Sequence, residues 1–302
     1  MYKIHSRLAV LVLTLLMMFV TSMVWAQAGD TAPHAGMVKG IYITQPTLED
    51  TTYLSYLIQR AKKVGIHTFI VDMEKPSKHY EANIALLHQN NINYVARIII
   101  FPGGGTPEQV KSIAYREKKY ALIKAAIAYG AKQIQLDYIR YSSKQPPSAK
   151  NAEDILQIIR WYKTRINVPL QVDVFGISSF GPSKWIGQDI KLFSSSVDVF
   201  CPMVYPSHYE PYKIHAVKPY DTVYSSLMAI HKQFNNQPLP FKLYPFIELS
   251  NYRYPLSRNK KLEYIHAQIQ AAENANADGW YVWSPHNYYD NLFTVLETKS
   301  VK

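Results

Sequence analysis

The fold is decided by the stretch Gln133-Ile134-Gln135-Leu136-Asp137-Tyr138-Ile139-Arg140-Tyr141. Its residues alternate as in a β-strand, which predicts Ile134, Leu136 and Tyr138 on one face and Gln135, Asp137 and Ile139 on the other. A helical pattern that ends at Gly130 precedes the stretch, and a Ser/Gln/Pro turn and a second helical pattern follow it. A (β/α)8 barrel places its catalytic groups at the carboxyl ends of strands that alternate with helices in this way. We therefore expect Asp137 to lie at the functional face of such a barrel.

The same alternation continues in both directions from this stretch. Strand patterns cover residues 39–44, 66–72, 93–101, 133–141, 169–175, 197–205, 241–249 and 279–283. Helical patterns cover residues 47–64, 79–90, 116–129, 149–166, 183–192, 219–234, 259–274 and 290–297. Eight strands in this order predict an α/β protein with a single (β/α)8 TIM barrel over residues 39–300. A doubly wound sheet is the alternative, but no Gly-x-Gly-x-x-Gly turn follows the first strand pattern.

The N-terminus has the pattern of a cleavable signal peptide. Lys3 and Arg7 precede an apolar run over residues 8–20, and Val24-Trp25-Ala26 supplies small residues at the −3 and −1 positions. We predict a signal peptide at 1–26, cleavage after Ala26, and a short linker at 27–38. An uncleaved membrane anchor is the alternative, but the apolar run is short for a membrane span. The prediction implies a secreted or periplasmic protein without stable membrane insertion after cleavage.

Composition limits the class of partner. The formal net charge is +11 and the sequence pI is about 9.4. The lysines and arginines are scattered without a long basic tract, which argues against nucleic-acid binding and suggests only a general affinity for anionic surfaces. The single cysteine, Cys201, lies in an apolar strand pattern, so no intramolecular disulfide can form and a small core residue is expected. We expect a monomer.

Polar groups gather at the predicted carboxyl ends of the strands. They are Asp72, Glu74, Arg97, Asp137, Arg140, Asp173, Tyr205, His208, Glu248, Trp283, His286 and Asn287. Each acid alone could form an ion pair or cap a helix, but several acids at one end of a barrel, with two arginines to balance them, indicate a built site. Asp198 differs, because it begins the sixth strand pattern at the opposite face, where a structural role is expected.

Paired carboxyl groups suit the cleavage of a glycosidic bond. One group protonates the leaving oxygen, and the other attacks the anomeric carbon or activates a water. Asp137 and Asp173 lie on neighbouring strands, and Glu248 is an alternative partner from across the barrel mouth. These three are the predicted catalytic residues. The predicted substrate-binding residues are Asp72, Arg97, Arg140, Tyr205, His208, Trp283 and Asn287.

Other chemistries have little support in the sequence. There is no His-Glu-x-x-His, no close His/Cys cluster and no Gly-x-Ser-x-Gly. His208 and His215 are seven residues apart in one loop, a spacing without metal-ligand logic. We therefore expect no metal and no cofactor.

Five motifs in order resemble a family. They are Leu136-Asp137-Tyr138-Ile139-Arg140-Tyr141, Asp173-Val174-Phe175-Gly176, Ile186-Gly187-Gln188-Asp189, Pro202-Met203-Val204-Tyr205-Pro206-Ser207-His208-Tyr209 and Gly279-Trp280-Tyr281-Val282-Trp283-Ser284-Pro285. Together they resemble a bacterial glycoside hydrolase domain family of poorly characterised function with a (β/α)8 barrel. The resemblance covers residues 39–289 and implies a sugar-polymer hydrolase with Asp137 and Asp173 as its central acids.

The chain departs from this family in two places. Where the family tends to show Pro-Trp-Leu-Gln-Asp-Phe, this chain has Pro245-Phe246-Ile247-Glu248-Leu249-Ser250, so the acid has moved by one position and onto the other side of the strand. The family's Asp-x-Lys-Asp is Asp72-Met73-Glu74-Lys75 here. A more distant resemblance to amylase-like barrels implies a strand-four nucleophile and a strand-five proton donor.

These observations predict a glycoside hydrolase that acts on a poly- or oligosaccharide by a two-carboxylate mechanism. Asp137 is expected to be the nucleophile or base and Asp173 the general acid. Arg97 and Arg140 are expected to orient the acids, while Tyr205 and His208 bind substrate hydroxyls. The alternative is a non-catalytic carbohydrate-binding protein on the same scaffold, since a fold alone does not determine function. A different lyase or hydrolase chemistry on this barrel is a third possibility.

Overall fold

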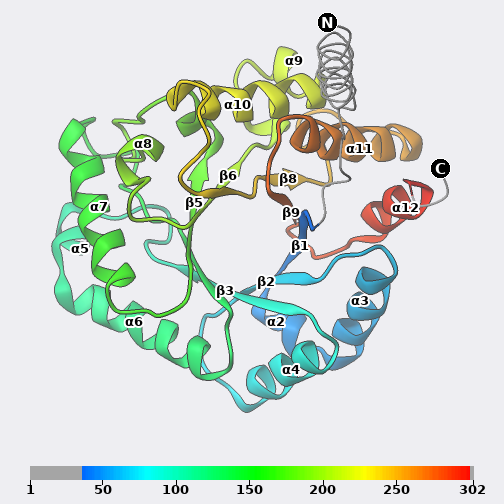
Figure 1. Ribbon diagram of the computed structural model, residues 1–302, viewed down its shortest axis with the longest axis horizontal. Helices are drawn as coiled ribbons and strands as arrows, with labels where there is room; N and C mark the ends of the chain where they lie inside the picture. Colours follow the sequence, from blue (N-terminus) through cyan, green and yellow to red (C-terminus); the bar gives the residue numbers. More distant parts are fainter. Residues whose placement is uncertain (1–35, 300–302) are drawn as a thin grey trace, which may run out of the picture. The chain divides into compact units, whose positions relative to one another are not determined.

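The computed structural model describes residues 36–299 and shows a closed barrel of parallel strands (Figure 1). Neighbouring strands pair in parallel around the barrel, and the pairing of β5 with β6 completes the circle. The strands are β1 Val38–Ile43, β2 Thr68–Asp72, β3 Asn93–Ile99, β4 Gln133–Asp137, β5 Leu170–Phe175, β6 Val199–Met203, β7 Lys242–Leu243, β8 Phe246–Glu248 and β9 Gly279–Trp283. The predicted α/β barrel is confirmed, and its seventh strand consists of the two pieces β7 and β8.

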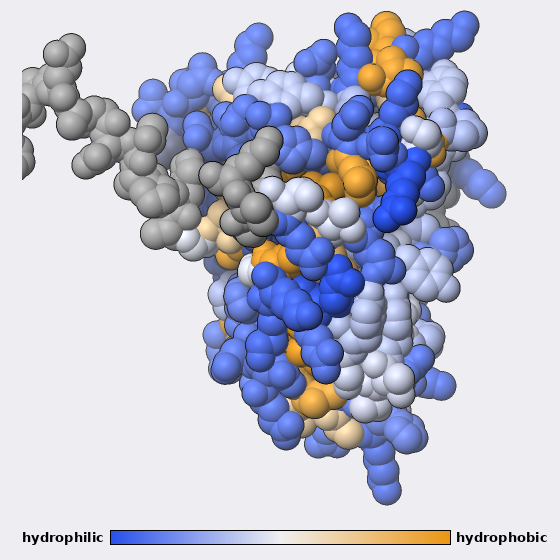
Figure 2. Space-filling view, turned by 90° about the vertical axis from the view of Figure 1, so that its right-hand side faces the viewer, coloured by the Kyte–Doolittle hydropathy of each residue, from blue (hydrophilic) through white to orange (hydrophobic). Residues whose placement is uncertain are grey.

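Helices form an outer ring around these strands (Figure 1). They are α2 Gln45–Glu49, α3 Thr51–Lys63, α4 Lys78–Gln89, α5 Pro107–Lys111, α6 Ile113–Ala128, α7 Ala149–Lys163, α8 Ile190–Phe193, α9 Tyr212–His215, α10 Pro219–Gln233, α11 Arg258–Asn274 and α12 Asp290–Lys299, with 3-10 turns η1 Gly176–Phe180 and η2 Pro206–His208. The side of the barrel that bears α3, α11 and α12 is largely hydrophilic, with small, separated hydrophobic areas (Figure 2). That pattern is typical of helices that bury one face against a sheet.

The expected helix over residues 47–64 is two helices, α2 and α3. Asp50 ends α2, and its side chain accepts a hydrogen bond from the Tyr53 amide, so it caps α3. An aspartate satisfies free amides at a helix start better than it continues a helix. Ser112 plays the same part between α5 and α6, where its side chain accepts from the Tyr115 amide.

The seventh strand is interrupted at Pro245. Only Val199 and Phe200 of β6 pair with β7, and only Met203 pairs with β8. Pro245 has no amide hydrogen to donate, and β6 carries a proline of its own, Pro202. The ladder between the sixth and seventh strands is therefore broken into two short parts, whereas β2 and β3 pair in continuous register from Thr68 to Asp72.

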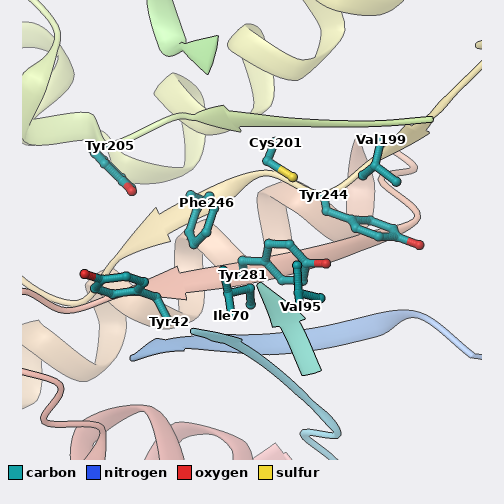
Figure 3. Packing of buried hydrophobic residues seen from close by; sticks show 9 residues of the cluster. All are labelled: Tyr42, Ile70, Val95, Val199, Cys201, Tyr205, Tyr244, Phe246 and Tyr281. Atoms are coloured by element: carbon teal, nitrogen blue, oxygen red, sulfur yellow. The ribbon is translucent and has the colours of Figure 1, made fainter. Parts of the chain in front are cut away.

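The barrel interior contains an apolar cluster with a polar layer. The cluster comprises Tyr42, Ile70, Val95, Val199, Cys201, Tyr205, Tyr244, Phe246 and Tyr281. Figure 3 shows Val199 and Tyr244 at one end of it and Tyr42 and Tyr205 at the other. Within the barrel, Gln171 binds Gln135 at 3.0 Å and the Tyr281 hydroxyl at 3.0 Å, and the Cys201 thiol donates to Gln171 at 3.3 Å. The prediction of Cys201 as a core residue is confirmed, because it is fully buried.

The predicted signal peptide and most of the predicted linker lie outside the described residues. Over residues 36–299, no helix combines the length and the apolar character that a membrane crossing requires.

Candidate active site

A pocket of about 520 Å³ opens at the carboxyl ends of the barrel strands. Residues from β1, β3, β4, β5, β6, β8 and β9 and from the loops after them line it. They are Tyr42, Arg97, Asp137, Tyr138, Asp173, Phe175, Gly176, Ile177, Met203, Tyr205, His208, Tyr209, Glu210, Phe246 and Trp283. Of the ten predicted site residues, the structure brings six together here: Arg97, Asp137, Asp173, Tyr205, His208 and Trp283.

Arg97 holds the acids of the pocket floor. Its guanidinium forms ion pairs with Asp72 and Asp137, and its Nε lies 3.1 Å from Asp137 Oδ2 and 3.7 Å from Asp173 Oδ2. Burial alone would lower the pKa of Arg97, but the charges of Asp137 and Asp72 raise it well above its ordinary value. Since one Nε is shared, the two Oδ2 atoms can be no farther apart than the sum of those two distances. The prediction that Arg97 orients the acids agrees with this geometry.

Asp173 is more deeply buried than Asp137. It is 1% exposed, and its Oδ1 has no hydrogen-bond partner among the described residues. Burial, and next the charge of Asp137, raise its pKa well above the ordinary value, against the opposing charge of Arg97. A buried carboxyl beside a second acid is the arrangement that holds a proton for transfer.

The carboxyl group of Asp137 differs from that of Asp173, because both of its oxygens accept hydrogen bonds. Its Oδ2 accepts hydrogen bonds from Arg97, and its Oδ1 accepts the amide hydrogen of Tyr138 at 2.5 Å. These donors stabilise a carboxylate. Tyr138 has φ of 51°, in the left-handed region that a non-glycine residue rarely adopts. The strand ends at Asp137, so the expected alternation stops there and Tyr138 lines the pocket instead of sharing a face with Leu136.

Aromatic rings form one wall of the pocket. Tyr205 stacks on Trp283 with ring centroids 5.1 Å apart and an interplanar angle of 23°. His208 lies edge-on to both rings, and Tyr252 contacts His208 and Trp283 at 5.8 and 5.6 Å. Burial and the nearby Asp173 raise the pKa of Tyr205 well above its ordinary value, so its hydroxyl keeps its hydrogen. Flat rings of this kind present apolar faces with polar edges, as sugar binding requires.

Glu248 does not line the pocket. It is fully buried and accepts hydrogen bonds from the Ser207 amide and hydroxyl, both at 2.8 Å, and from the Tyr264 hydroxyl at 2.6 Å. Its Oε2 also lies 3.3 Å from Nδ1 of His208. The contacts therefore place Glu248 behind the pocket residue His208.

Three other predicted residues support the pocket without lining it. Asp72 forms an ion pair with Arg97 and accepts a hydrogen bond from the Tyr42 hydroxyl at 2.5 Å. Arg140 lies 4.8 Å from the Phe175 ring and 5.5 Å from the Tyr138 ring, behind two lining residues. Asn287 is buried, and its side chain binds the Thr44 amide and the Tyr42 carbonyl.

Sequence reasoning missed several lining residues. Tyr42 is on β1, Phe175 is the last residue of β5, and Glu210 follows β6. Tyr42 and Phe175 could have been found by applying the strand-end rule to aromatic side chains on the first and fifth strands as well. Glu210 follows the quoted Pro202–Tyr209 motif directly, so its position in the chain was the available signal.

A metal ion would need several of the described side chains to bind it together. In the part of the chain covered by residues 36–299, no group of three His, Cys, Asp or Glu side chains is arranged to hold a metal ion. The acids of the floor are instead grouped around Arg97.

Asp198 lies at the other end of the barrel. It forms an ion pair with Lys163 and accepts the Leu170 amide at 2.6 Å. These contacts join α7, β5 and the start of β6, in agreement with the structural role expected of it.

Solved structures with this fold include several carbohydrate-active enzymes. The Bacillus cereus spore cortex-lytic enzyme SleL matches with a TM-score of 0.63 and 13% identity, over 87% of this chain and 74% of SleL. An endo-beta-1,4-mannanase from Thermotoga petrophila matches with a TM-score of 0.62 and 12% identity, over 88% of this chain and 76% of that one. A chitinase from Chromobacterium violaceum matches with a TM-score of 0.60 and 10% identity, over 89% and 100%. At these identities the likeness establishes the fold.

The sequence itself was compared with curated proteins and with protein families. No curated protein matches it. A family described as "Putative glycosyl hydrolase domain" matches residues 108–289, which include β4, β5, β6, β8 and β9 and therefore Asp137, Asp173 and the aromatic wall. This match covers more than half of the chain and confirms the resemblance seen in the motifs. The chain belongs to this family of glycosidase-type hydrolases.

Proposed function

We propose that this protein hydrolyses a poly- or oligosaccharide with Asp137 and Asp173 as its two working carboxyl groups. The observation that carries the proposal is the shared Arg97, which holds Asp137 and Asp173 side by side in one pocket, where burial and the charge of Asp137 raise the pKa of Asp173. Two carboxyl groups with separated protonation states are what acid-assisted cleavage of a glycosidic bond needs.

The roles follow from the two environments. A carboxylate oxygen of Asp137 attacks the anomeric carbon, the bond to the leaving oxygen breaks, and Asp173 gives its proton to that oxygen. Asp173, now ionised, then takes a proton from a water that attacks the same carbon, and the ester to Asp137 breaks. The upper limit on the Oδ2 separation is compatible with the roughly 5–5.5 Å between the carboxyl groups of retaining enzymes, which favours them over the roughly 6.5–9.5 Å of inverting enzymes. We therefore assign retention of configuration.

The substrate is a sugar chain that fits an aromatic-walled pocket. Tyr205 and Trp283 would stack on a sugar ring, while His208 and Glu210 would meet hydroxyl groups at the rim. The names of the solved structures above supply a test panel: chitin, β-1,4-mannan and spore cortex. The predicted signal peptide leads us to propose that this chemistry takes place outside the cytoplasm.

The test compares Asp137→Asn and Asp173→Asn with the wild type on this panel. Each variant should lose about 10²- to 10⁴-fold in kcat, because a proton-transfer or nucleophilic group has been neutralised. Asp198→Asn, which changes a partly exposed aspartate at the opposite end of the barrel, is the matched control and should keep wild-type activity. Reducing-end release measures the rate, and proton NMR of the first-formed anomer measures the stereochemistry. Full activity of Asp137→Asn on a hydrolysed glycan would refute the assignment, and an inverted product would refute retention.

Carbohydrate binding without catalysis remains the alternative function. The stacked wall of Tyr205 and Trp283 could bind a sugar with no help from the acids. Glycan binding by the wild type, with no release of reducing ends on any member of the panel, would favour this alternative.

A further inference from the structure

A second group of aromatic rings lies outside the pocket, between α3 and the loop that follows β9. We call Tyr53, Tyr56, Tyr288 and His286 the tyrosine platform. Tyr53 and Tyr56 are stacked with centroids 5.8 Å apart and planes within 17°. Tyr288 meets Tyr53 edge-on at 6.4 Å, and His286 lies 6.4 Å from Tyr288. Four rings from two distant segments of the chain are thus in contact.

The platform is held in place although it faces solvent. The Tyr53 hydroxyl donates to the Asn287 carbonyl at 2.9 Å, and the Tyr56 hydroxyl donates to Asp290. Tyr288 is nevertheless 67% exposed. An aromatic ring that is fixed by its neighbours but open to water can bind a ligand with little loss of side-chain entropy.

Hydrogen-bonding groups border these rings. The Asp290 carboxylate and the Arg60 guanidinium lie 4.0 Å apart, and Arg60 sits 6.0 Å from the centre of the Tyr56 ring. Burial, and next the charge of Asp290, raise the pKa of Tyr53 to about 12, so its hydroxyl stays neutral at physiological pH. Flat apolar faces beside a carboxylate, a guanidinium and neutral hydroxyls are the surface that a sugar ring recognises.

The platform is connected to the pocket through Asn287. The backbone carbonyl of Asn287 accepts a hydrogen bond from the Tyr53 hydroxyl, and the side-chain amide of Asn287 donates one to the backbone carbonyl of Tyr42 at 3.4 Å. The side chain of Tyr42 lines the pocket. Both segments follow the carboxyl ends of neighbouring strands, β1 and β9, so they lie at the same end of the barrel as the acids. Figure 1 shows α3 and α12 beside these two strands.

We propose that the tyrosine platform is a second carbohydrate-binding site, which holds a distant part of the same long glycan chain whose scissile bond lies in the pocket. This inference rests on the proposed function and deepens it, because it assigns a polymeric substrate. On this proposal the platform adds affinity for chains long enough to span both sites, and none for an oligosaccharide that occupies the pocket alone.

The test uses the full chain and the Tyr288→Ala variant. Hydrolysis is measured on chitin, β-1,4-mannan and spore cortex, and on short soluble oligosaccharides of whichever polymer is cleaved. Tyr288→Ala should raise KM for the polymer about three- to tenfold and leave kcat/KM for the oligosaccharide unchanged. Tyr288→Phe should behave as wild type because it keeps the ring. Tyr224→Ala on α10, which also removes one ring of a stacked tyrosine pair, is the matched control.

A binding measurement separates this proposal from the proposed function. Co-sedimentation with each insoluble polymer is followed for the wild type and for Tyr288→Ala, whether or not either hydrolyses it. Weaker sedimentation of Tyr288→Ala supports the platform even if no glycan is cleaved. Equal sedimentation, an equal loss on polymer and oligosaccharide, or no binding by the wild type overturns the platform; continued hydrolysis in any of these cases leaves the pocket assignment standing.

Discussion

At the scale of single residues, Glu248 and His208 are in contact with each other, but only His208 lines the pocket. Glu248 is buried and saturated with hydrogen bonds, and the half-exposed His208 stands between it and the pocket. The partners of Nδ1 are the Ser207 hydroxyl at 3.4 Å and Glu248 at 3.3 Å, so Nε2 is the ring nitrogen left to meet a sugar hydroxyl. We propose that Glu248 is a positioning residue for His208.

Glu248→Gln tests this role. Glutamine keeps an oxygen for the Ser207 amide and the Tyr264 hydroxyl but removes the charge that orients His208. We expect KM to rise several-fold with kcat nearly unchanged, because only substrate positioning is lost. His208→Ala should show the same split. A fall of about 10²-fold or more in kcat for Glu248→Gln alone would mark it as a catalytic acid, as the sequence first suggested.

The raised pKa of Asp173 has a consequence for stability. Above the ordinary aspartate pKa of about 3.9, the unfolded chain has lost this proton while the folded chain still binds it. The free energy of unfolding therefore falls as pH rises from there, until the folded carboxyl ionises as well. Asp173→Asn should flatten this part of the profile, which urea unfolding between pH 4 and pH 8 measures. An unchanged slope in the variant would contradict the protonated state.

The same proton shapes the activity profile. General-acid catalysis needs Asp173 protonated, so kcat should decline on the alkaline side as the proton is lost. The apparent pKa of that limb belongs to the coupled acids around Arg97, not to one carboxyl alone.

At the scale of elements, the sequence predicted the order of strands and helices. It was wrong over residues 183–192, where only α8 Ile190–Phe193 is helical, and where a single polar residue or proline decides. The alternation of β4 and the apolar run of β3 were sufficient to place them. The break at Asp50 and the gap at Pro245 depend on one cap and one missing amide, which a periodic pattern does not register. The end of the barrel that bears the pocket could be predicted because strand ends in a barrel share one rim. The direction of Glu248 could not, because it depends on tertiary partners.

The first turn after β5 shows how closely elements meet beside the pocket. A Cβ on Gly176 would lie 1.9 Å from the Tyr209 hydroxyl oxygen and 2.7 Å from the Met203 carbonyl oxygen. Gly176→Ala should therefore destabilise the protein by roughly 1–3 kcal/mol or more and displace a pocket wall. Urea unfolding measures the cost. In a double-mutant cycle, Tyr209→Leu should reduce the penalty of Gly176→Ala; strict additivity would show that this clash is not its source.

At the scale of the whole molecule, the backbone pairing between neighbouring strands differs from one side of the barrel to the other. The ladder between the sixth and seventh strands is broken between Phe200 and Met203 and includes Pro202, which has no amide hydrogen, whereas β2 and β3 are continuously paired. Local opening should follow the interrupted ladder. In hydrogen exchange followed by mass spectrometry, we expect peptides over 199–205 and 242–248 to exchange faster than those over 68–72 and 93–99. Equal protection of the two regions would show that packing, not pairing, governs the opening.

The closed barrel could be predicted from the sequence, but the contacts that its closure creates could not. Eight strands in order predicted a closed barrel because few topologies satisfy that alternation. The contact of Tyr53 with Tyr288 joins residues more than two hundred positions apart, and nothing in either local pattern indicated it. Contacts of that kind arise from closure itself, which brings β1 beside β9.

One arginine serving three carboxyl groups has a consequence for inhibitor design. The carboxyl groups of Asp72, Asp137 and Asp173 outnumber the single guanidinium of Arg97 that they share, and Glu210 adds a further carboxyl group at the rim. A sugar ring gains positive charge as its glycosidic bond breaks, so this excess matches the transition state better than the substrate. An iminosugar, whose ring nitrogen is protonated at neutral pH, carries a positive charge in its ring without any bond having to break. Such cationic ring mimics are the natural starting ligands for this pocket.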